Sequence, residues 1–574
     1  MLDKISYSLP DKIGVIVAKK IKEWRAEDKI SRLWAKDASL WTNSDEAKWL
    51  GWLDVIEREL GDLRKYHDFS REVQQFDDIV LLGMGGSSLC PEVFALTFGV
   101  GNFHVLDSTV PAQVKAVEDK IDLAKTLFVV ASKSGSTLEP NCFKQYFYER
   151  VAETVGRENA GRHFVAITDP GSKMQQVAER DGFRRIFFGD PEIGGRFSAL
   201  SVFGMAAAAA MQINVEAFLQ SAREMAQACK ENAEENPAVK LGIILGVCQR
   251  AGRDKLTIFT SPEIYDLGAW MEQLIAESTG KNGVSIIPID REPVFSPAFT
   301  RQLSKEGTQN FLGNDRVFVY LKLTDNPVDD AVSALESSGH PFITIEIGDT
   351  MDLGQEFFRW EFATAVAGSV MGIDPFNQPD VESAKIEARK ITDEYEQTGS
   401  LPPETPFFES DGIQLFSSEK YAAQLNDAVG EEKTLKRYFE KHISAPGEGD
   451  YFATLAYVQM NEENAAALRK LRERILELNS APSCLGFGPR FLHSTGQAYK
   501  GGANNGVFLQ ITVDDEFDLP VPGQSYTFGV VKAAQSRGDF QVLLDRGRRA
   551  LRVHFSGGTI SDGLEHLANL LDEI

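Results

Sequence analysis

Residues 127–141 read LFVVASKSGSTLEPN, and this stretch does most to decide the fold. It begins with an apolar, β-branched run of the kind that forms a buried parallel strand. A helix is predicted to begin near Leu138, so Ser132 to Thr137 form the turn between the strand and the helix. A strand that passes through a tight turn into a helix is the building unit of an α/β protein.

The turn itself is rich in hydrogen-bond donors. Four hydroxyl side chains and the ammonium of Lys133 surround Gly135, which permits the backbone angles that an anion-binding nest requires. The turn leads into a helix N-terminus, where backbone N–H groups and the helix dipole favour an anion. Serine and threonine often only cap a helix, but so many donors in one turn favour a phosphate site over simple capping. The Gly-x-x-x-x-Gly-Lys spacing of a Walker loop is missing.

The same alternation of strand and helix extends in both directions from this turn. Buried strands are predicted within residues 77–85, 103–108, 127–132 and 163–169, and a second block of strands and helices follows between residues 238 and 370. We therefore predict an α/β fold with two parallel sheets, each flanked by helices, and ligands at the carboxyl ends of the strands.

The rest of the chain suggests a four-part organisation. We expect a helical N-terminal segment over residues 1–65, a first α/β domain over 66–233, a second over 234–395, and a C-terminal α/β domain over 396–574. The polar, Pro- and Glu-rich residues after Lys390 are interpreted as a linker. The tryptophans of the N-terminal segment are expected to pack against a neighbouring domain.

Composition excludes several classes of function. A net charge of −24 argues against nucleic acid or an anionic membrane as a partner, and it means that a phosphate must be held by local donors. No apolar run approaches the length of a membrane span, and no secretory signal is visible. The five cysteines are scattered without a Cys-x-x-Cys pair, which favours a cytoplasmic protein without disulfides or zinc.

Two further glycine-rich turns are candidates for the same pocket. Residues 77–91, DDIVLLGMGGSSLCP, place Gly86 and Ser87 after a strand, but the spacing does not complete a dinucleotide-binding fingerprint. Residues 194–198, GGRFS, hold Arg196 at a helix start, where it could neutralise charge developing on an oxygen. Each pattern alone is weak, and an isolated arginine of this kind is usually a surface residue.

Three later segments supply possible acid–base groups. Gln273 and Glu277 are four residues apart and share one face of a helix, although an isolated glutamate is usually only exposed. Gln378 and Lys385 lie at the start and on the second turn of a helix that begins with Pro379. His493 lies among Gly, Ser and Gln residues in a predicted loop.

Taken together and in this order, the segments GMGGSS, SKSGST, GGRFS, Gln273-x-x-x-Glu277-Ser278 and Gln378-Pro379-x-Val381-Glu382-x-x-Lys385 resemble the signatures of the phosphoglucose isomerases. The resemblance covers roughly residues 75–395 and implies two sugar-isomerase (SIS) domains. The whole chain is most similar to the isomerase portion of bifunctional transaldolase–phosphoglucose isomerase proteins, but it contains no transaldolase barrel.

The resemblance implies an activity and a set of roles. The expected reaction is the reversible conversion of D-glucose 6-phosphate into D-fructose 6-phosphate through ring opening and a cis-enediolate, in a cytoplasmic homodimer without a cofactor or metal. Glu277 would be the base, Arg196 would stabilise the enediolate, and Lys385 and His493 would assist ring opening. The substrate or its phosphate would be held by Gly86, Ser87, Ser132, Lys133, Ser134, Thr137, Gln273 and Gln378.

The sequence departs from the family pattern in the position of its histidine. In the family the histidine motif precedes the glutamine–lysine helix and belongs to the partner subunit, whereas LHSTGQ here follows that helix. His493 is therefore either the equivalent residue, reached by a rearranged chain, or a residue of another role. A second departure is Pro140, where many relatives carry a hydroxyl residue. We expect it to have only a modest effect on the phosphate contacts.

Two other functions remain open from the sequence. A sugar-phosphate-binding regulator would keep the serine turn and could dispense with a base and an arginine. An isomerase that also accepts mannose 6-phosphate would need the same pocket.

Overall fold

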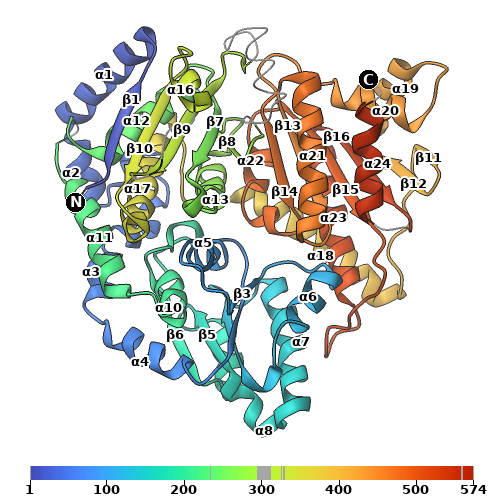
Figure 1. Cartoon of the computed structure of the whole chain (residues 1–574), viewed down its shortest axis with the longest axis horizontal. Coiled ribbons are helices and arrows are strands. Elements are labelled where there is room, and N and C mark those ends of the chain that lie inside the picture. Colours follow the sequence, from blue (N-terminus) through green and yellow to red (C-terminus); the bar gives the residue numbers. More distant parts are fainter. Residues whose placement is uncertain are drawn as a thin grey trace.

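The computed structural model describes residues 2–232, 234–293, 312–324, 326, 330–557 and 560–572. Within these residues, the strands form three separate sheets with helices packed on their faces (Figure 1). The α/β prediction is therefore confirmed. No helix in the described part of the chain has the length and apolarity needed to cross a bilayer.

The N-terminal segment is mainly helical, as predicted, but it begins with a strand. Its elements are β1 (Lys4–Ser8), α1 (Asp11–Ala26), α2 (Lys29–Trp34), α3 (Val55–Leu60) and α4 (Arg64–Val73). Strand β1 pairs antiparallel with β10 (Phe342–Ile347) of the second sheet, which the sequence analysis did not foresee. The five-residue strand alternates between half-buried and exposed side chains, as an edge strand does, and is too short to stand out from sequence alone.

Each sheet with the helices on its faces is called a unit below. The tryptophans of the N-terminal segment pack against a buried helix of the second unit, as expected. Trp34 and Trp52 both contact Phe358 and Phe362 of α17 (Leu353–Met371). Almost every residue of α17 is buried, with the charged Glu356, Arg359 and Glu361 among them, because the helix lies between neighbouring helices. The N-terminal segment therefore completes the core of the second unit.

The first sheet is wholly parallel and has the strand order β3-β2-β4-β5-β6. Its elements are β2 (Asp78–Leu82), α5 (Leu89–Thr97), β3 (Phe103–Leu106), α6 (Pro111–Glu118), β4 (Thr126–Ala131), α7 (Leu138–Val155), α8 (Arg157–Ala160), β5 (Phe164–Thr168), α9 (Lys173–Arg180), β6 (Arg185–Phe188), α10 (Val202–Ala210) and α11 (Val215–Ala228). Chain order reverses at the β2/β4 pair, so this sheet has its ligand-binding switch point between the two donor-rich turns.

The second sheet has the order β1-β10-β9-β7-β8, with all strands but β1 parallel. Its elements are α12 (Pro237–Arg250), β7 (Lys255–Thr260), α13 (Leu267–Thr279), β8 (Ile287–Asp290), β9 (Arg316–Leu323), α16 (Asp330–Glu336), β10, α17 and α18 (Pro379–Thr398). Helix α18 begins at Pro379, as the sequence predicts, and has Gln378 as its N-cap residue.

The third sheet repeats the strand order of the second. Its elements are β11 (Phe408–Ser410), β12 (Ile413–Phe416), α19 (Glu419–Val429), α20 (Leu435–Ile443), β13 (Tyr451–Tyr457), α21 (Glu462–Asn479), β14 (Ser483–Phe487), α22 (Gly496–Gly501), β15 (Gly506–Val513), α23 (Phe528–Asp545), β16 (Arg549–Phe555) and α24 (Ile560–Asp572). The order β14-β13-β15-β16 matches β8-β7-β9-β10, and in both sheets an antiparallel strand follows. The C-terminal unit therefore has the topology of the second unit.

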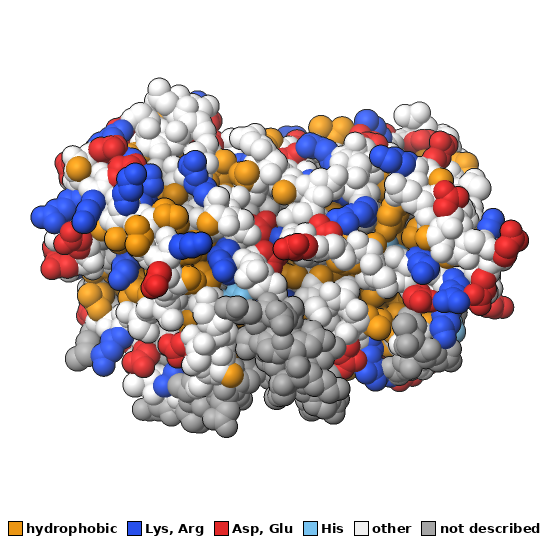
Figure 2. Space-filling model, turned by 90° about the horizontal axis from the view of Figure 1, so that it is seen from above, with side chains coloured by type: hydrophobic (Ala, Val, Ile, Leu, Met, Phe, Trp, Pro, Cys, Tyr) orange, Lys and Arg blue, Asp and Glu red, His pale blue; other side chains and the backbone are white. Residues whose placement is uncertain are grey.

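The three units meet around α18 and the carboxyl ends of the first sheet. Helix α18 packs along α23 of the C-terminal unit (Figure 1). Val521 and Phe528 of the C-terminal unit share a hydrophobic core with residues of α7 in the first unit. Acidic and basic side chains are interspersed on the face seen in Figure 2, with no large area of one sign.

Candidate active site

The serine-rich turn has the geometry of an anion site. Strand β4 ends at Ala131 and α7 begins at Leu138, as predicted. Gly135 has a φ of 66°, and a Cβ atom added there would lie 2.2 Å from the backbone nitrogen of Met174, so no other residue fits this position. The turn is therefore held in a left-handed conformation at the N-terminus of a long helix.

Its hydroxyl groups are not used to cap the helix. Thr137 occupies the N-cap position of α7, yet its side chain accepts no capping hydrogen bond. Ser132 is buried and its Oγ has no hydrogen-bond partner, while Ser134 and Ser136 contact each other at 2.8 Å between their Oγ atoms. The alternative in which these residues only cap a helix is therefore not what the structure contains.

Lys133 is placed differently from its neighbours. Its ammonium forms an ion pair with Asp169 at 2.5 Å and donates to the backbone carbonyl of Asp190 at 2.9 Å. The side chain is not among those that line the cavity described below. The sequence shows that an ammonium lies in this turn, but no motif predicts that it pairs with Asp169, which follows the next strand.

The turn after β2 packs against the arginine turn. A Cβ atom at Gly86 would lie 2.0 Å from the carbonyl oxygen of Gly195, so this glycine allows two backbones to approach each other. Ser87 ends the short 3₁₀ turn Gly85–Ser87 and is half-buried. Asp107, which follows β3, contacts Ser88 and Arg490 at 2.9 Å and 2.8 Å.

Arg196 lies at the centre of a buried cluster. Its guanidinium donates to the Oγ of Ser278 at 2.7 Å and to the Oε1 of Gln378 at 2.9 Å, and it lies 3.5 Å from the Oε1 of Glu277. It also donates to the backbone carbonyls of Pro375 and Asn377. The arginine that sequence alone reads as a surface residue thus joins α13 to the loop before α18.

Both charges in this cluster are almost fully removed from solvent. The side chains of Arg196 and Glu277 are 1% and 6% exposed, and burial lowers the pKa of Arg196 while Glu277 acts against that shift. The Oε2 atom of Glu277 is buried without a hydrogen-bond partner. A carboxylate with one unpaired oxygen is free to accept a proton from a ligand.

Lys281 is a buried cation that the sequence analysis did not identify. Its ammonium donates to the carbonyl of Asn377 and to the Oδ1 of the same residue, the latter at 3.0 Å. Burial, and then the charge of Arg196, lower the pKa of Lys281. Lys281 and Arg196 therefore both donate to the backbone carbonyl of Asn377, the residue before Gln378.

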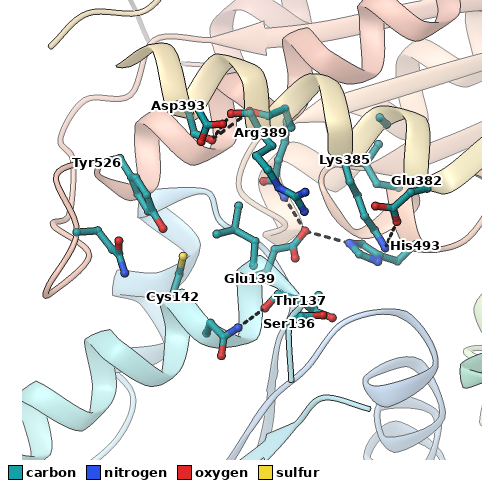
Figure 3. A pocket seen from close by; sticks show the side chains of 18 of the residues that line it. Ser136, Thr137, Glu139, Cys142, Glu382, Lys385, Arg389, Asp393, His493 and Tyr526 are labelled. Carbon is teal, nitrogen blue, oxygen red and sulfur yellow. Dashed lines mark hydrogen bonds and ion pairs between the residues drawn. The ribbon is translucent and has the colours of Figure 1, made fainter. Parts of the chain in front are cut away.

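His493 reaches the serine turn from the C-terminal unit. It lies in the 3₁₀ turn Arg490–His493 after β14, and its Nε2 is 2.9 Å from the Oε1 of Glu139, in the first turn of α7. Figure 3 shows the glutamate and the histidine pointing at each other, with Lys385 of α18 beside them. Burial acts to raise the pKa of Glu139, but the charge and hydrogen bond of His493, a backbone hydrogen bond and the charge of Lys385 together lower it.

A cavity of about 660 Å³ opens next to this pair. Its wall includes the predicted residues Ser134, Thr137, Lys385 and His493, together with Glu139. Arg196, Glu277, Gln378, Ser87, Ser132 and Lys133 are not part of that wall. The structure thus divides the predicted site into a group that lines the cavity and a group that does not, of which Ser132, Arg196 and Glu277 are buried.

Gln273 joins the two groups. It lies one helical turn before Glu277 on α13, and its Nε2 donates to the backbone carbonyl of His493 at 2.7 Å. Its Oε1 is buried without a partner, like the Oε2 of Glu277. Of the two residues predicted to share this helix face, Gln273 thus contacts the turn that carries His493, and Glu277 lies beside Arg196.

Two residues of the cavity region have no sequence signal strong enough to identify them. Glu139 follows the serine turn, where an acidic residue in a first helical turn is common. Gln535, on α23, donates from its Nε2 to the Oε1 of Glu139 at 2.6 Å, and no local motif marks it. No group of side chains suited to hold a metal ion is found among the described residues.

Comparisons with known proteins agree with one another. Residues 67–289 match the sequence model of the family described as phosphoglucose isomerase. A probable glucose-6-phosphate isomerase of Methanococcus maripaludis is 27% identical over 58% of this chain and 82% of its own length. A glucose-6-phosphate isomerase of Thermus thermophilus is 28% identical over 59% of this chain and 89% of its own.

One solved structure has a similar fold. A hypothetical protein, also from Thermus thermophilus, superimposes with a TM-score of 0.58 at 24% identity, over 67% of this chain and 99% of that chain. The match agrees with the α/β architecture described above.

Proposed function

The chain belongs to the phosphoglucose isomerase family, and from that premise we propose that it interconverts D-glucose 6-phosphate and D-fructose 6-phosphate. The observation that carries the proposal is that buried Arg196 lies 3.5 Å from the carboxylate of Glu277 and donates to Gln378 at 2.9 Å, in a protein that also has a hydroxyl-rich turn at a helix N-terminus. A base, a cation and an anion-binding turn are the parts that an aldose–ketose isomerase needs.

The phosphate would bind at the serine turn. Ser132, Ser134 and Thr137 offer hydroxyl groups, and the N-terminus of α7 offers backbone N–H groups and the positive end of its dipole. We assign Ser87 and Gly86 to the opposite wall of the same pocket. Lys133 is assigned here from the family resemblance, although its ammonium faces Asp169.

Proton transfer is assigned to Glu277. In the open-chain aldose, the carboxylate removes the proton from C2, the electron pair of that C–H bond forms a C1–C2 double bond, and the C1 carbonyl oxygen takes up negative charge. Returning the proton to C1, with the hydroxyl proton on O2 passing to O1, gives the ketose. Arg196 would stabilise the charge on oxygen, because a buried guanidinium interacts strongly with an adjacent anion.

Substrate contacts on the other side of the reacting carbons are assigned to Gln378 and Gln273. Both amides are fixed by protein contacts, Gln378 through Arg196 and Gln273 through the backbone of His493. Fixed donors and acceptors reduce the freedom of the open-chain sugar, which lowers the entropic cost of reaching the enediolate.

Ring opening is assigned to His493 and Lys385, which line the cavity together. Breaking the C1–O5 bond requires one proton to leave the O1 hydroxyl and another to reach O5. An imidazole and an ammonium can carry out these two transfers near neutral pH. The hydrogen bond from His493 to Glu139 supports this role, because a carboxylate partner fixes the orientation of the ring.

We also propose that the four segments predicted from the sequence are the domains of the protein, and that it works in the cytoplasm without a cofactor. All five cysteines are buried free thiols, which suits a reducing compartment. The family resemblance implies a homodimer. Because His493 reaches Glu139 within a single chain, the proposed site does not depend on that association.

The test is turnover in deuterated water. Purified protein incubated with glucose 6-phosphate is expected to yield fructose 6-phosphate with deuterium at C1, detected by NMR. Phosphate-ester binding without turnover would instead assign the protein to the sugar-phosphate regulators. Running the same assay with mannose 6-phosphate measures the breadth of its specificity.

A further inference from the structure

A chain of buried hydrogen bonds leads from the first unit through the C-terminal unit to His493. Thr109 Oγ1 donates to Gln535 Oε1 at 2.6 Å, Gln535 Nε2 donates to Glu139 Oε1 at 2.6 Å, and His493 Nε2 contacts the same oxygen at 2.9 Å. Thr109 is completely buried, and Gln535 and Glu139 are each 4% exposed. The assigned reaction leaves Thr109 and Gln535 without a role.

The donor and the acceptor of each of these hydrogen bonds follow from what the side chains can donate or accept. A carboxylate only accepts hydrogen bonds, so Gln535 must present its amide N–H₂ to Glu139 and its carbonyl to Thr109. The hydroxyl of Thr109 then donates, which holds the amide in that orientation. With Glu139 ionised, the Nε2 of His493 must carry the hydrogen.

These hydrogen bonds determine which ring nitrogen of His493 carries the hydrogen. A neutral histidine carries one ring hydrogen, so fixing it on Nε2 leaves Nδ1 as the nitrogen with a free lone pair. His493 lines the cavity, and its Nδ1 has no hydrogen-bond partner within the described part of the chain. The nitrogen without a hydrogen is thus the one available to a ligand.

We propose that Gln535, oriented by Thr109, is a positioning residue that fixes the tautomer of His493 through Glu139, so that Nδ1 exchanges protons with the sugar. This inference rests on the proposed ring-opening role of His493. It also gives the C-terminal unit two contributions to the site, the histidine itself and the amide that holds its carboxylate partner.

Other ionisable groups also act on Glu139 and must be considered in any pH measurement. Lys385 of α18 favours its ionised form, and Cys142 of α7 and Tyr457 of β13 each feel its charge. Both of these last groups have raised pKa values, chiefly because they are buried, so both stay neutral near pH 7. His493 and Lys385 are the side chains that favour the ionised form of Glu139.

The test uses the full chain with two isosteric substitutions. Gln535→Leu removes the donor to Glu139, and Thr109→Val leaves the amide free to turn its oxygen toward the carboxylate. We expect Gln535→Leu to lower kcat about 10-fold, in line with the loss of a hydrogen bond to a charged group, while KM changes less than 2-fold. Gln541→Leu is the matched control, because Gln541 lies on the same helix but is exposed and donates its side-chain hydrogen bond to Asp545, one turn further along.

A double variant tests more directly whether Thr109 acts through Gln535. If Thr109 acts only by orienting Gln535, the double variant should be no slower than Gln535→Leu alone. Losses that multiply would mean that Thr109 acts independently of Gln535 and would overturn the proposed order of these hydrogen bonds. Thermal unfolding of all variants separates this result from a general loss of stability.

The tautomer can be observed without any turnover. In protein labelled with ¹⁵N-histidine, the signal of His493, assigned by its absence in His493→Asn, should be that of an Nε2–H imidazole at a pH where the ring is neutral. Gln535→Leu should shift it toward a mixture of tautomers. A wild-type Nδ1–H ring, or spectra and pH–rate profiles that do not change in Gln535→Leu, would overturn the proposal even if the protein is an isomerase. A wild-type protein without isomerase activity but with the expected ¹⁵N signal would reject only the proposed function.

Discussion

The side-chain amide of Gln273 donates to the backbone carbonyl of His493 at 2.7 Å, across 220 positions of the chain. One helical turn further along α13, Glu277 lies beside Arg196. The helix that carries the proposed base therefore also fixes the turn that carries the proposed ring-opening histidine. One helix, α13, therefore sets the distance between the two residues to which proton transfer and ring opening are assigned.

Replacing Glu277 by Gln should abolish turnover and leave substrate affinity nearly unchanged. The amide keeps the size of the side chain but cannot accept the C2 proton, and loss of a general base typically costs about 10²- to 10⁴-fold in rate. Deuterium exchange at C2 measures the step directly. Exposed Glu216 on α11, changed to Gln, is the control. An affinity that falls in step with the rate would make Glu277 a structural residue.

Mixing two inactive variants should not restore activity. Because His493 contacts Glu139 of its own chain, every molecule of Glu277→Gln and every molecule of His493→Ala has one defective site. Equal amounts of the two, unfolded and refolded together, should stay at the level of the less impaired variant. Recovery of a quarter or more of wild-type activity would require a site shared between chains.

Arg196→Lys should be strongly impaired despite the retained charge. The guanidinium makes contacts with Ser278, Gln378 and two backbone carbonyls, which a single ammonium cannot reach together. We expect kcat to fall about 100-fold, comparable to the loss of an oxyanion-stabilising donor. A variant that keeps most of its kcat would show that any cation at this position is sufficient.

The serine turn and Lys133 should respond differently to substitution. Ser134→Ala and Thr137→Ala should each raise KM about 10-fold, because each removes a donor from a charged ligand. Lys133→Ala should change KM less and lower the melting temperature more, since its ammonium holds Asp169 and the carbonyl of Asp190. The reverse order of effects on KM would mean that Lys133 leaves Asp169 when the phosphate binds.

Glu361, in the middle of buried α17, should make the protein less stable as pH rises. Burial raises its pKa well above the ordinary value, while the backbone N–H of Ala199 acts against this. A carboxyl with a raised folded-state pKa retains its proton in the folded chain where the unfolded chain has lost it. Its cost therefore appears as pH rises above the unfolded pKa of about 4.3 and grows until the folded pKa is reached.

Glu361→Gln removes this titration. The melting temperature of the variant, compared with that of the wild type, should be similar near pH 4 and higher at pH 7. A difference that stays constant across this range would mean that the carboxyl does not change its charge on unfolding.

The local elements of the site could be predicted from sequence, because each is determined by neighbouring residues. The β4 strand, the turn at Gly135 and the start of α18 at Pro379 follow from apolar runs and from the backbone preferences of glycine and proline. The fold class follows from the same alternation. These features need no knowledge of distant contacts.

Partners distant in sequence could not be predicted in this way. The pairing of Lys133 with Asp169, and of Glu139 with Gln535, depends on how whole units pack against each other. The short edge strand β1 is likewise stabilised by a sheet more than three hundred residues away in the chain. The family resemblance raised the question of how His493 could reach the site, and only the packing of the C-terminal unit answers it.

The C-terminal unit, whose sheet repeats the strand order of the second, is part of the same chain as Glu139, and this has a consequence for how the proposed site behaves on dilution. The turn bearing His493 is tethered to the rest of the site by the chain, so its effective concentration there is set by covalent connection and packing. A histidine supplied by a separate subunit would instead be lost as subunits dissociate. Specific activity should accordingly be the same at low and at high protein concentration.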